Sequence, residues 1–276
     1  MDELQRKIIN YYDQTDSSYQ HWGEEEIYNM HYGFWDGRIQ SHVESLNNMN
    51  WVLAEKLKIK HGDKILDAGC GVGASSIWLA KHYDIEVIGI TLSGLQCEKA
   101  NNFAKKENVS ERVKFYVQDF TETNFSDKSF DIVWTIEGIC HVPNKEDFVK
   151  EAYRILKDNG KLIIADGFIG KDNFSKLDCY LLNNWIGRWF VPNLAKTSDF
   201  QKYLREAGFK NIKFIDITKE ILPSAREIFK RGILGWLVYK LKRKNQIKMN
   251  HIKGCIFQYL ALKKGAWIYG IFYAEK

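Results

Sequence analysis

Four residues at alternate positions in one short stretch have the types and spacing to bind a ligand. Asp67, Gly69, Gly71 and Gly73 follow the apolar pair Ile65–Leu66 and precede a segment with a helical pattern. Glycine adopts positive φ and lets a ligand approach the backbone, and the start of a helix offers free N–H groups. The acid would repel a pyrophosphate, and the spacing is not the G-x-G-x-x-G of dinucleotide enzymes. The stretch therefore predicts a site for a ligand with a cationic end.

The pattern Asp-x-Gly-x-Gly-x-Gly after a strand resembles the first motif of the class I S-adenosylmethionine-dependent methyltransferases. S-adenosylmethionine (SAM) carries an α-ammonium group and a sulfonium and has no phosphate, which suits the acid at Asp67. The resemblance implies SAM as cofactor and S-adenosylhomocysteine as product, with no metal expected. It also implies an α/β fold, a Rossmann-like doubly wound sheet of seven strands with the last strand antiparallel.

The residues after the second expected strand are neutral. Most enzymes of this class place an acid there to hold the ribose hydroxyls, whereas this chain has Thr91. The stretch Gly-Ile-Thr-Leu-Ser at residues 89–93, followed by Gln96, is similar to tocopherol and sterol C-methyltransferases and to mycolic acid cyclopropane synthases. This similarity implies that Thr91, Leu92 and Gln96 contact the cofactor, with Thr91 and Gln96 hydrogen bonding around the ribose. Ser93 is expected to be the N-cap of the next helix.

Asp119 and Phe120 follow the third expected strand. The family resemblance implies that Asp119 accepts a hydrogen bond from the adenine amino group and that Phe120 packs beside the ring. A buried acceptor discriminates between ligands because an unpaired polar group in a closed pocket is costly. The alternative is that Asp119 ends the strand and starts a turn.

Glu137 and His141 follow the fourth expected strand and are the candidate catalytic residues. Histidine can take a proton from an oxygen or nitrogen acceptor, and a carboxylate can stabilise a carbocation formed from an alkene. The Glu…Cys-His pattern resembles the tocopherol, sterol and squalene methyltransferase-like group. It implies that both residues lie at the methyl group of the cofactor, which Glu137 also contacts. Two structural alternatives stay open: that His141 holds its loop or packs against the cofactor, and that Glu137 forms a hydrogen bond to the N-terminal cap.

Aromatic residues are candidates for the acceptor pocket. The chain has 9 Trp and 16 Phe, more than the core of one small sheet needs, and ligand pockets are often lined by such side chains. Tyr32 and Trp35 belong to an aromatic stretch that is similar to one in prenyl and sterol methyltransferases. Together with Trp185 and His141 they form the predicted substrate pocket. For any single aromatic residue, ordinary packing is the alternative.

Short apolar strands alternate with amphipathic helices along the chain, which predicts right-handed crossovers and a parallel sheet covered on both faces. Strands are expected at 64–68, 86–90, 113–118, 130–136, 161–166, 212–217 and 267–273, and helices at 75–82, 95–107, 145–156 and 198–207. The dipeptide Asn159–Gly160 is expected to end the third of these helices.

The predicted organisation has two parts. Residues 1–60 are expected to form a helical cap on the ligand edge of the sheet. Residues 61–276 are expected to form the methyltransferase core, with acceptor-pocket insertions at about 170–197 and 219–264. A length of 276 residues with 45% hydrophobic content suits one enzyme-sized unit.

The composition of the chain limits the cellular compartment and the binding partners that we expect for the protein. The five cysteines form no C-x-x-C pair, which argues against a zinc site or a disulfide framework, and no signal peptide is visible, so a cytoplasmic protein is expected. The segment 240–264 is rich in lysine and contains no acid. It can be a solvated helix face, or it can meet an anionic substrate or a membrane surface. Nucleic acid is not an expected partner, because the motifs of base methylation are absent from the sequence.

These features predict a SAM-dependent methyltransferase that acts on a small, largely hydrophobic molecule. Carbon methylation of an isoprenoid, a quinone or a related natural product is the leading hypothesis. Methylation of oxygen or nitrogen in a small metabolite, phospho-base amines included, is the second, with His141 as general base. A protein that binds SAM without transferring methyl is the third. The acceptor, the methylated atom and the oligomeric state stay open.

Overall fold

The computed structural model describes residues 1–20, 29, 31–242 and 245–276, with side chains described for 1–15, 29, 31–238 and 245–276. Part of the predicted cap (21–28 and 30) and two bases of the lysine-rich segment (Arg243 and Lys244) thus lie outside the described residues.

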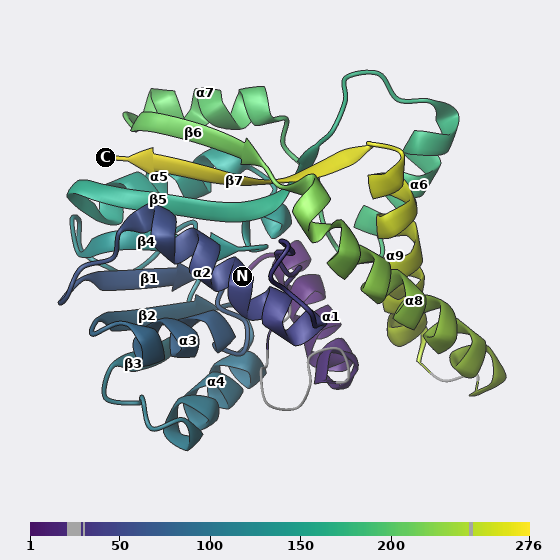
Figure 1. The fold of residues 1–276 in the computed structure, drawn as a ribbon, viewed down its shortest axis with the longest axis horizontal. Coiled ribbons are helices and arrows are strands. Elements are labelled where there is room, and N and C mark those ends of the chain that lie inside the picture. The colour runs from purple at the N-terminus through teal and green to yellow at the C-terminus, as the bar shows by residue number, and fades with distance from the viewer. Residues whose placement is uncertain (21–28, 30, 243–244) are drawn as a thin grey trace.

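The strands form one seven-stranded mixed sheet (Figure 1). They are β1 (Lys64–Ala68), β2 (Glu86–Thr91), β3 (Val113–Val117), β4 (Phe130–Ile136), β5 (Leu156–Ile169), β6 (Lys210–Asp216) and β7 (Trp267–Glu275). Their order is β3-β2-β1-β4-β5-β7-β6, with β1 to β5 parallel and β7 antiparallel to both β5 and β6. The predicted fold class is confirmed.

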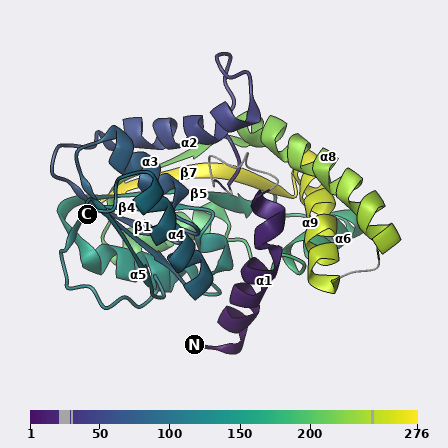
Figure 2. The same ribbon diagram turned by 90° about the horizontal axis from the view of Figure 1, so that it is seen from below.

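Helices cover both faces of the sheet, because successive residues of a buried strand point to opposite sides. Ile65 of β1 packs in a core with α2 (His42–Leu57), α3 (Ala74–His82) and α4 (Gly94–Lys106), whereas Leu66 packs in a second core with α5 (Lys145–Ile155) and α7 (Thr197–Ala207). Figure 2 shows α2 and α5 on opposite sides of the sheet.

Four helices lie beyond the carboxyl ends of the parallel strands (Figure 1). They are α1 (Glu3–Gln20), α6 (Lys176–Ile186), α8 (Thr218–Lys242) and α9 (Gln246–Lys263), and a short 3-10 helix η1 (Ile139–His141) follows β4. Of the predicted cap, α1 lies at this ligand edge, whereas α2 packs on a face of the sheet through Met49, Leu53 and Leu57.

The boundary between α5 and β5 differs from the prediction. Leu156, expected at the end of the helix, is extended and pairs with Phe130 of β4, so α5 ends at Ile155. Asn159 and Gly160 do not end the helix. They form an irregularity inside β5, where Asn159 has a φ of 63° and the register to β4 shifts. Pairing of Leu156 with β4 thus overrides the local helical pattern.

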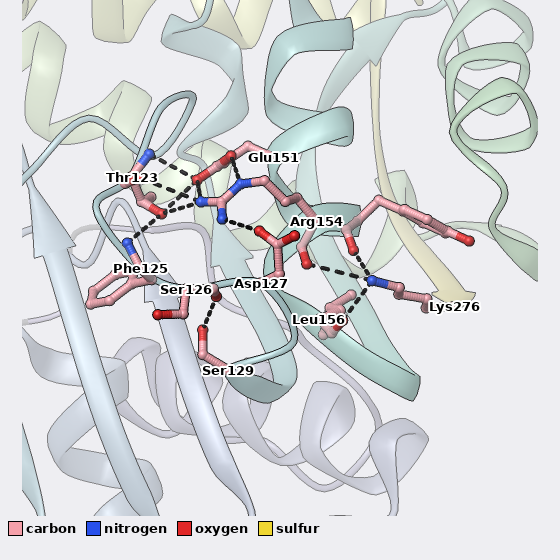
Figure 3. Close-up of polar contacts among 10 residues, drawn as sticks. Thr123, Phe125, Ser126, Asp127, Ser129, Glu151, Arg154, Leu156 and Lys276 are labelled. Carbon is pink, nitrogen blue, oxygen red and sulfur yellow. Dashed lines mark hydrogen bonds and ion pairs between the residues drawn. The ribbon is translucent and has the colours of Figure 1, made fainter.

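A polar network fixes α5 to the loop that precedes β4 (Figure 3). Glu151 Oε1 accepts hydrogen bonds from the Thr123 backbone N at 2.8 Å and from Arg154 Nη2 at 2.7 Å. Arg154 Nη1 also donates to Asp127 at 2.6 Å. Lys276 Nζ donates to the Leu156 carbonyl at 2.7 Å, at the C-terminal end of α5, where a cation is favourable.

Candidate active site

A cavity lies where the strand order reverses between β1 and β4, the expected ligand site of an open α/β sheet. Its wall contains most of the predicted site residues: Tyr32, Asp67, Gly69, Gly71, Thr91, Leu92, Gln96, Phe120, Glu137, His141 and Trp185. Gly73, Asp119 and Trp35 are described residues that do not line it. The cofactor, catalytic and pocket assignments remain predictions, but the structure brings most of these side chains to one place.

The three glycines of the motif have positive φ but different surroundings. A Cβ atom on Gly71 (φ +55°) would meet no atom within 4 Å, so the backbone there is open to the cavity. A Cβ on Gly69 would lie 3.3 Å from Gly138 Cα, where the loops after β1 and β4 meet. A Cβ on Gly73 would lie 2.5 Å from the ring of Phe115. Gly73 therefore lets α3 pack closely on the sheet.

Asp67 is a buried acid in the cavity wall. Ser76 of α3 donates a hydrogen bond to its Oδ2 at 2.6 Å, which fixes the carboxyl group at the end of β1. Burial raises the pKa of Asp67 to about 7 despite this bond, because the charged form loses hydration. A bound cation would favour the ionised form.

The neutral residues after β2 form a hydrogen-bonded pair. Thr91 Oγ1 donates to Gln96 Oε1 at 2.7 Å, and both side chains are buried in the cavity wall. Ser93 accepts from the Gln96 backbone N at 3.1 Å and is the N-cap of α4, so that prediction is confirmed. Ser93 also donates to Asp13 of α1 at 2.6 Å, which ties the N-terminal helix to the loop after β2.

Asp119 and Phe120, which follow β3, have different surroundings. Phe120 lines the cavity, whereas both oxygens of Asp119 bond to protein groups. Its Oδ1 accepts from the backbone and the hydroxyl of Thr121, as in a turn, and its Oδ2 accepts from Gln5 of α1. If Asp119 binds an adenine amino group, that group has to share or replace the Gln5 contact.

Glu137 is held in a strained backbone conformation, with a φ of 54° directly after β4. Its Oε1 accepts hydrogen bonds from the Tyr32 backbone N at 2.7 Å and from the Tyr269 hydroxyl at 2.9 Å. Burial raises the pKa of Glu137 to about 8, and the nearby carboxyl of Asp166 adds to the shift. The carboxyl group therefore joins the N-terminal segment, β4 and β7 at the cavity wall.

His141 forms a pair with Tyr12 of α1. The Tyr12 hydroxyl lies 2.7 Å from His141 Nε2, and the Phe190 carbonyl lies 3.3 Å from Nδ1. Because a carbonyl can only accept, Nδ1 carries the proton and Nε2 accepts from Tyr12. Burial lowers the pKa of His141 to about 4, so the ring is neutral at pH 7. Both side chains line the cavity.

Asp166 of β5 is a third acid in the cavity wall and, like Asp67, is buried. Its oxygens accept from the backbone N of Cys140 at 3.0 Å and of Gly167 at 2.7 Å, and burial raises its pKa to about 6. The described residues of the wall include no Lys or Arg. This charge distribution suits a cation and disfavours a phosphate.

Aromatic rings form a further part of the wall, where the chain segments before β1 and after β5 meet. The rings of Trp185 and Trp267 lie 4.5 Å apart, and the ring of Tyr32 packs against Tyr269 at 5.6 Å. Tyr32 donates its hydroxyl to Gln258 Oε1 at 2.8 Å. Trp35 lies outside this wall and is fixed by its backbone N, which donates to the Glu220 carbonyl.

Asp166, Tyr12 and Tyr269 are among the residues of the site that were not predicted from the sequence. Asp166 has a signal, because it follows the core of an apolar strand whose end faces the site. Tyr12 and Tyr269 have none: they belong to α1 and to the last strand, and only packing brings them to His141 and Glu137.

The part of the chain that the structure describes has neither a cluster of potential metal ligands nor a helix that could span a membrane. No group of three or more His, Cys, Asp or Glu side chains there could hold a metal ion. Likewise, no helix among the described residues combines the length and the apolar character that crossing a membrane requires.

Comparison with known proteins agrees with this geometry. The family described as "Methyltransferase domain" matches residues 66–164. The 27-O-demethylrifamycin SV methyltransferase of Amycolatopsis mediterranei is 32% identical over 74% of this chain and 73% of its own length. The 2-methyl-6-phytyl-1,4-hydroquinone methyltransferase of Synechocystis is 31% identical over 85% of this chain and 77% of its own length.

Among solved structures, the [4+2]-cyclase SpnF has the same fold, with a TM-score of 0.81 at 20% identity over 98% of this chain and 94% of its own. At this identity the likeness concerns the fold alone. The sequence relatives, the glycine-rich turn after β1 and the antiparallel β7 together establish the family. The chain belongs to the class I SAM-dependent methyltransferases.

Proposed function

We propose that this methyltransferase acts on carbon in a small, largely hydrophobic acceptor of the isoprenoid or quinone class. The observation that carries the proposal is the cavity wall: aromatic rings and three carboxyl groups, of buried Asp67 and Asp166 and half-buried Glu137, with no Lys or Arg among its described residues. Such a wall accepts an apolar body and stabilises positive charge that develops beside it. One relative, named for a phytyl hydroquinone, supports this acceptor class.

The wall also fits the cofactor. Bound SAM supplies a methyl group on a positively charged sulfur. We infer that Asp67 and the open backbone at Gly71 hold its ammonium end, and that Thr91 and Gln96 hydrogen bond to the ribose. Phe120 packs beside the adenine. The neutral Thr91–Gln96 pair is already buried and hydrogen bonded, so it can form these bonds without leaving a buried charge unpaired.

For carbon methylation, two groups of the chain carry the proposed chemistry. Glu137, when ionised, stabilises positive charge on the acceptor, together with the ring of Tyr269 that holds it. The methylated carbon must then lose a proton. We assign this step to Tyr12 and His141: the Tyr12 oxygen takes the proton and passes its own to His141 Nε2. The aromatic wall excludes water, which would compete for the methyl group.

Methylation of an acceptor hydroxyl is the second candidate, favoured by the same Tyr12–His141 pair. A neutral histidine held by a backbone carbonyl is prepared to receive a proton from a hydroxyl group through Tyr12. One relative is named for an O-demethylated substrate. A phospho-base acceptor fits less well, because the described wall has no cation for its phosphate.

The deciding experiment supplies methyl-labelled SAM to the purified protein with a cell extract divided into lipid and polar fractions. Label in the lipid fraction, bound to carbon by mass fragmentation, supports the proposal and identifies the acceptor. Label bound to oxygen or nitrogen would instead support the second candidate, methylation of a heteroatom. Tight SAM binding without transfer to prenylated quinols or to either fraction would favour a protein that only binds SAM.

Two variants test the proposed roles. Glu137→Gln keeps both hydrogen bonds to its carbonyl oxygen, and His141→Ala removes the base. Both are expected to keep the affinity for SAM within about threefold and to lower kcat by about 100-fold. Glu122→Gln, an exposed acid after β3, is the control. Loss of SAM binding in both site variants would show that these residues are structural.

A further inference from the structure

Helices α8 and α9 form a hairpin that extends away from the sheet (Figure 1). They pack closely, because a Cβ on Gly232 of α8 would lie 2.9 Å from the Cβ of Cys255 of α9. The outer face of α8 changes character along its length. It begins with the exposed side chains of Arg226 and Lys230 and continues with apolar ones.

The apolar part of this face is exposed to solvent. Ile233, Leu234, Leu237 and Val238 have exposed fractions of 38%, 64%, 51% and 42%. Their spacing places them on one side of the helix, because Leu237 lies three positions after Leu234 and four after Ile233, and Val238 lies four after Leu234. We call these four residues the α8 tip surface. A soluble protein gains nothing by exposing four adjacent large apolar side chains unless they meet a partner.

The charge around this surface indicates the partner. The sequence has no acid between Glu227 and Glu275, and α8 continues from the tip surface into Lys240 and Lys242. Apolar side chains next to clustered bases are typical of helices that lie in the interface of an anionic membrane. A second copy of this chain is a poorer partner, because a symmetric contact would place the same bases against each other.

The position of the α8 tip surface connects it to the cavity. Ile228 lines the cavity, and the tip surface begins at Ile233, little more than one turn further along the same helix. A lipid surface bound at the tip would therefore lie close to the acceptor side of the cavity. A hydrophobic acceptor dissolved in that lipid would have a short path to the wall.

We propose that the α8 tip surface binds the surface of an anionic lipid bilayer, with Ile233, Leu234, Leu237 and Val238 entering the interface and the acid-free, lysine-rich sequence that follows supplying the positive charge. The binding is peripheral, since none of the described helices can span a membrane. The proposal goes beyond the proposed methyl transfer and does not need it to be correct.

The test measures co-sedimentation of the full-length protein with vesicles of neutral phosphatidylcholine and with vesicles that also contain phosphatidylglycerol. Binding to the anionic vesicles is expected, and it should fall about tenfold or more between about 0.1 M and about 1 M salt. The Leu234→Gln/Leu237→Gln variant should bind at least about tenfold less. The Lys240→Gln/Lys242→Gln variant should lose the preference for anionic lipid.

A matched control removes apolar area elsewhere. Tyr116→Gln/Val117→Gln changes two exposed side chains of β3, at the opposite edge of the sheet, and should leave vesicle binding unchanged. Thermal midpoints of all variants show that the fold persists. The proposal is wrong if the wild-type protein does not sediment with anionic vesicles. It is also wrong if Leu234→Gln/Leu237→Gln only converts a dimer to a monomer in light scattering.

Discussion

Tyr12 and His141 are 129 positions apart in the chain, and the Tyr12 hydroxyl lies 2.7 Å from His141 Nε2. The contact joins α1 to the loop after β4 inside the cavity wall. Nε2 is the ring nitrogen that can accept a proton, because Nδ1 donates to the Phe190 carbonyl, and the Tyr12 hydroxyl lies on this accepting nitrogen. The N-terminal helix is therefore part of the site as well as its cover.

We expect Tyr12→Phe to lower kcat by about 100-fold and to change the affinity for SAM by less than about threefold, because the variant removes only the hydroxyl that relays the proton. The double variant Tyr12→Phe/His141→Ala should be no slower than the slower single variant, since the two side chains act as one unit. Single-turnover kinetics measures the effect.

A second Tyr–His pair gives the comparison for this prediction. Tyr11 and His251 lie 2.6 Å apart and are both buried. Tyr11→Phe removes the same chemical group one residue away and should mainly lower the thermal midpoint. Equal losses of kcat in Tyr11→Phe and Tyr12→Phe would contradict a special role for Tyr12.

The contribution of Glu137 to the free energy of unfolding is expected to fall as the pH rises from about 5 to about 8, whereas His141, whose pKa burial lowers to about 4, contributes with the opposite sign below about pH 6.5. Burial raises the pKa of Glu137 to about 8, so the folded protein keeps a proton that the unfolded chain has released. The slope is at most about 1.4 kcal/mol per pH unit for one group and disappears below the ordinary pKa of glutamate. Asp67 and Asp166, with pKa values of about 7 and 6, contribute with the same sign.

Urea denaturation at several pH values measures how much Glu137 contributes to the pH dependence of the free energy of unfolding. Glu137→Gln should reduce the slope, because glutamine does not titrate, while Glu122→Gln should not change it. An unchanged slope in Glu137→Gln would mean that the carboxyl group is ionised in the folded protein.

Substitutions at two glycines of the motif should distinguish a role in helix packing from a role in SAM binding. Gly73→Ala places a Cβ 2.5 Å from the Phe115 ring at a φ of 85°, and we expect a loss of about 2–4 kcal/mol in stability. Gly71→Ala meets no atom, so it should cost about 1 kcal/mol for its positive φ and weaken SAM binding about tenfold. Calorimetry of unfolding and of binding measures both quantities. The reverse ranking of the two stability losses would contradict the assigned roles.

The network around Glu151 should stabilise the fold without affecting catalysis. Glu151→Ala leaves the buried Thr123 N–H without its acceptor and the Arg154 guanidinium with only the exposed Asp127 as its acidic partner, at an expected cost of about 2–3 kcal/mol (Figure 3). Asp127→Ala removes an acceptor whose side chain is 74% exposed and should cost less than about 1 kcal/mol. Chemical denaturation measures the free energy of unfolding of both variants. Similar losses in Glu151→Ala and Asp127→Ala would show that the network is not centred on Glu151.

The amino-acid sequence by itself determined the elements and the ligand class. Alternation of apolar strands with amphipathic helices predicted the sheet, and Asp67 with its following glycines predicted a cation-binding turn after the first strand. These signals are local: strand and helix periodicity, turn residues and strand ends all lie within a few positions of each other. The same locality explains the error at Leu156, where a helical pattern continued into a strand that is fixed by its neighbours.

Only the tertiary structure decided which side chains meet. It joined Tyr12 to His141, set Tyr269 against Glu137, and placed Asp166 beside them. It also separated Gly73, Asp119 and Trp35 from the cavity wall and left the α8 tip surface exposed. The physical reason is that these contacts depend on how whole helices and strands pack. Packing distributes its energy over many small contacts, and no short stretch of sequence records it.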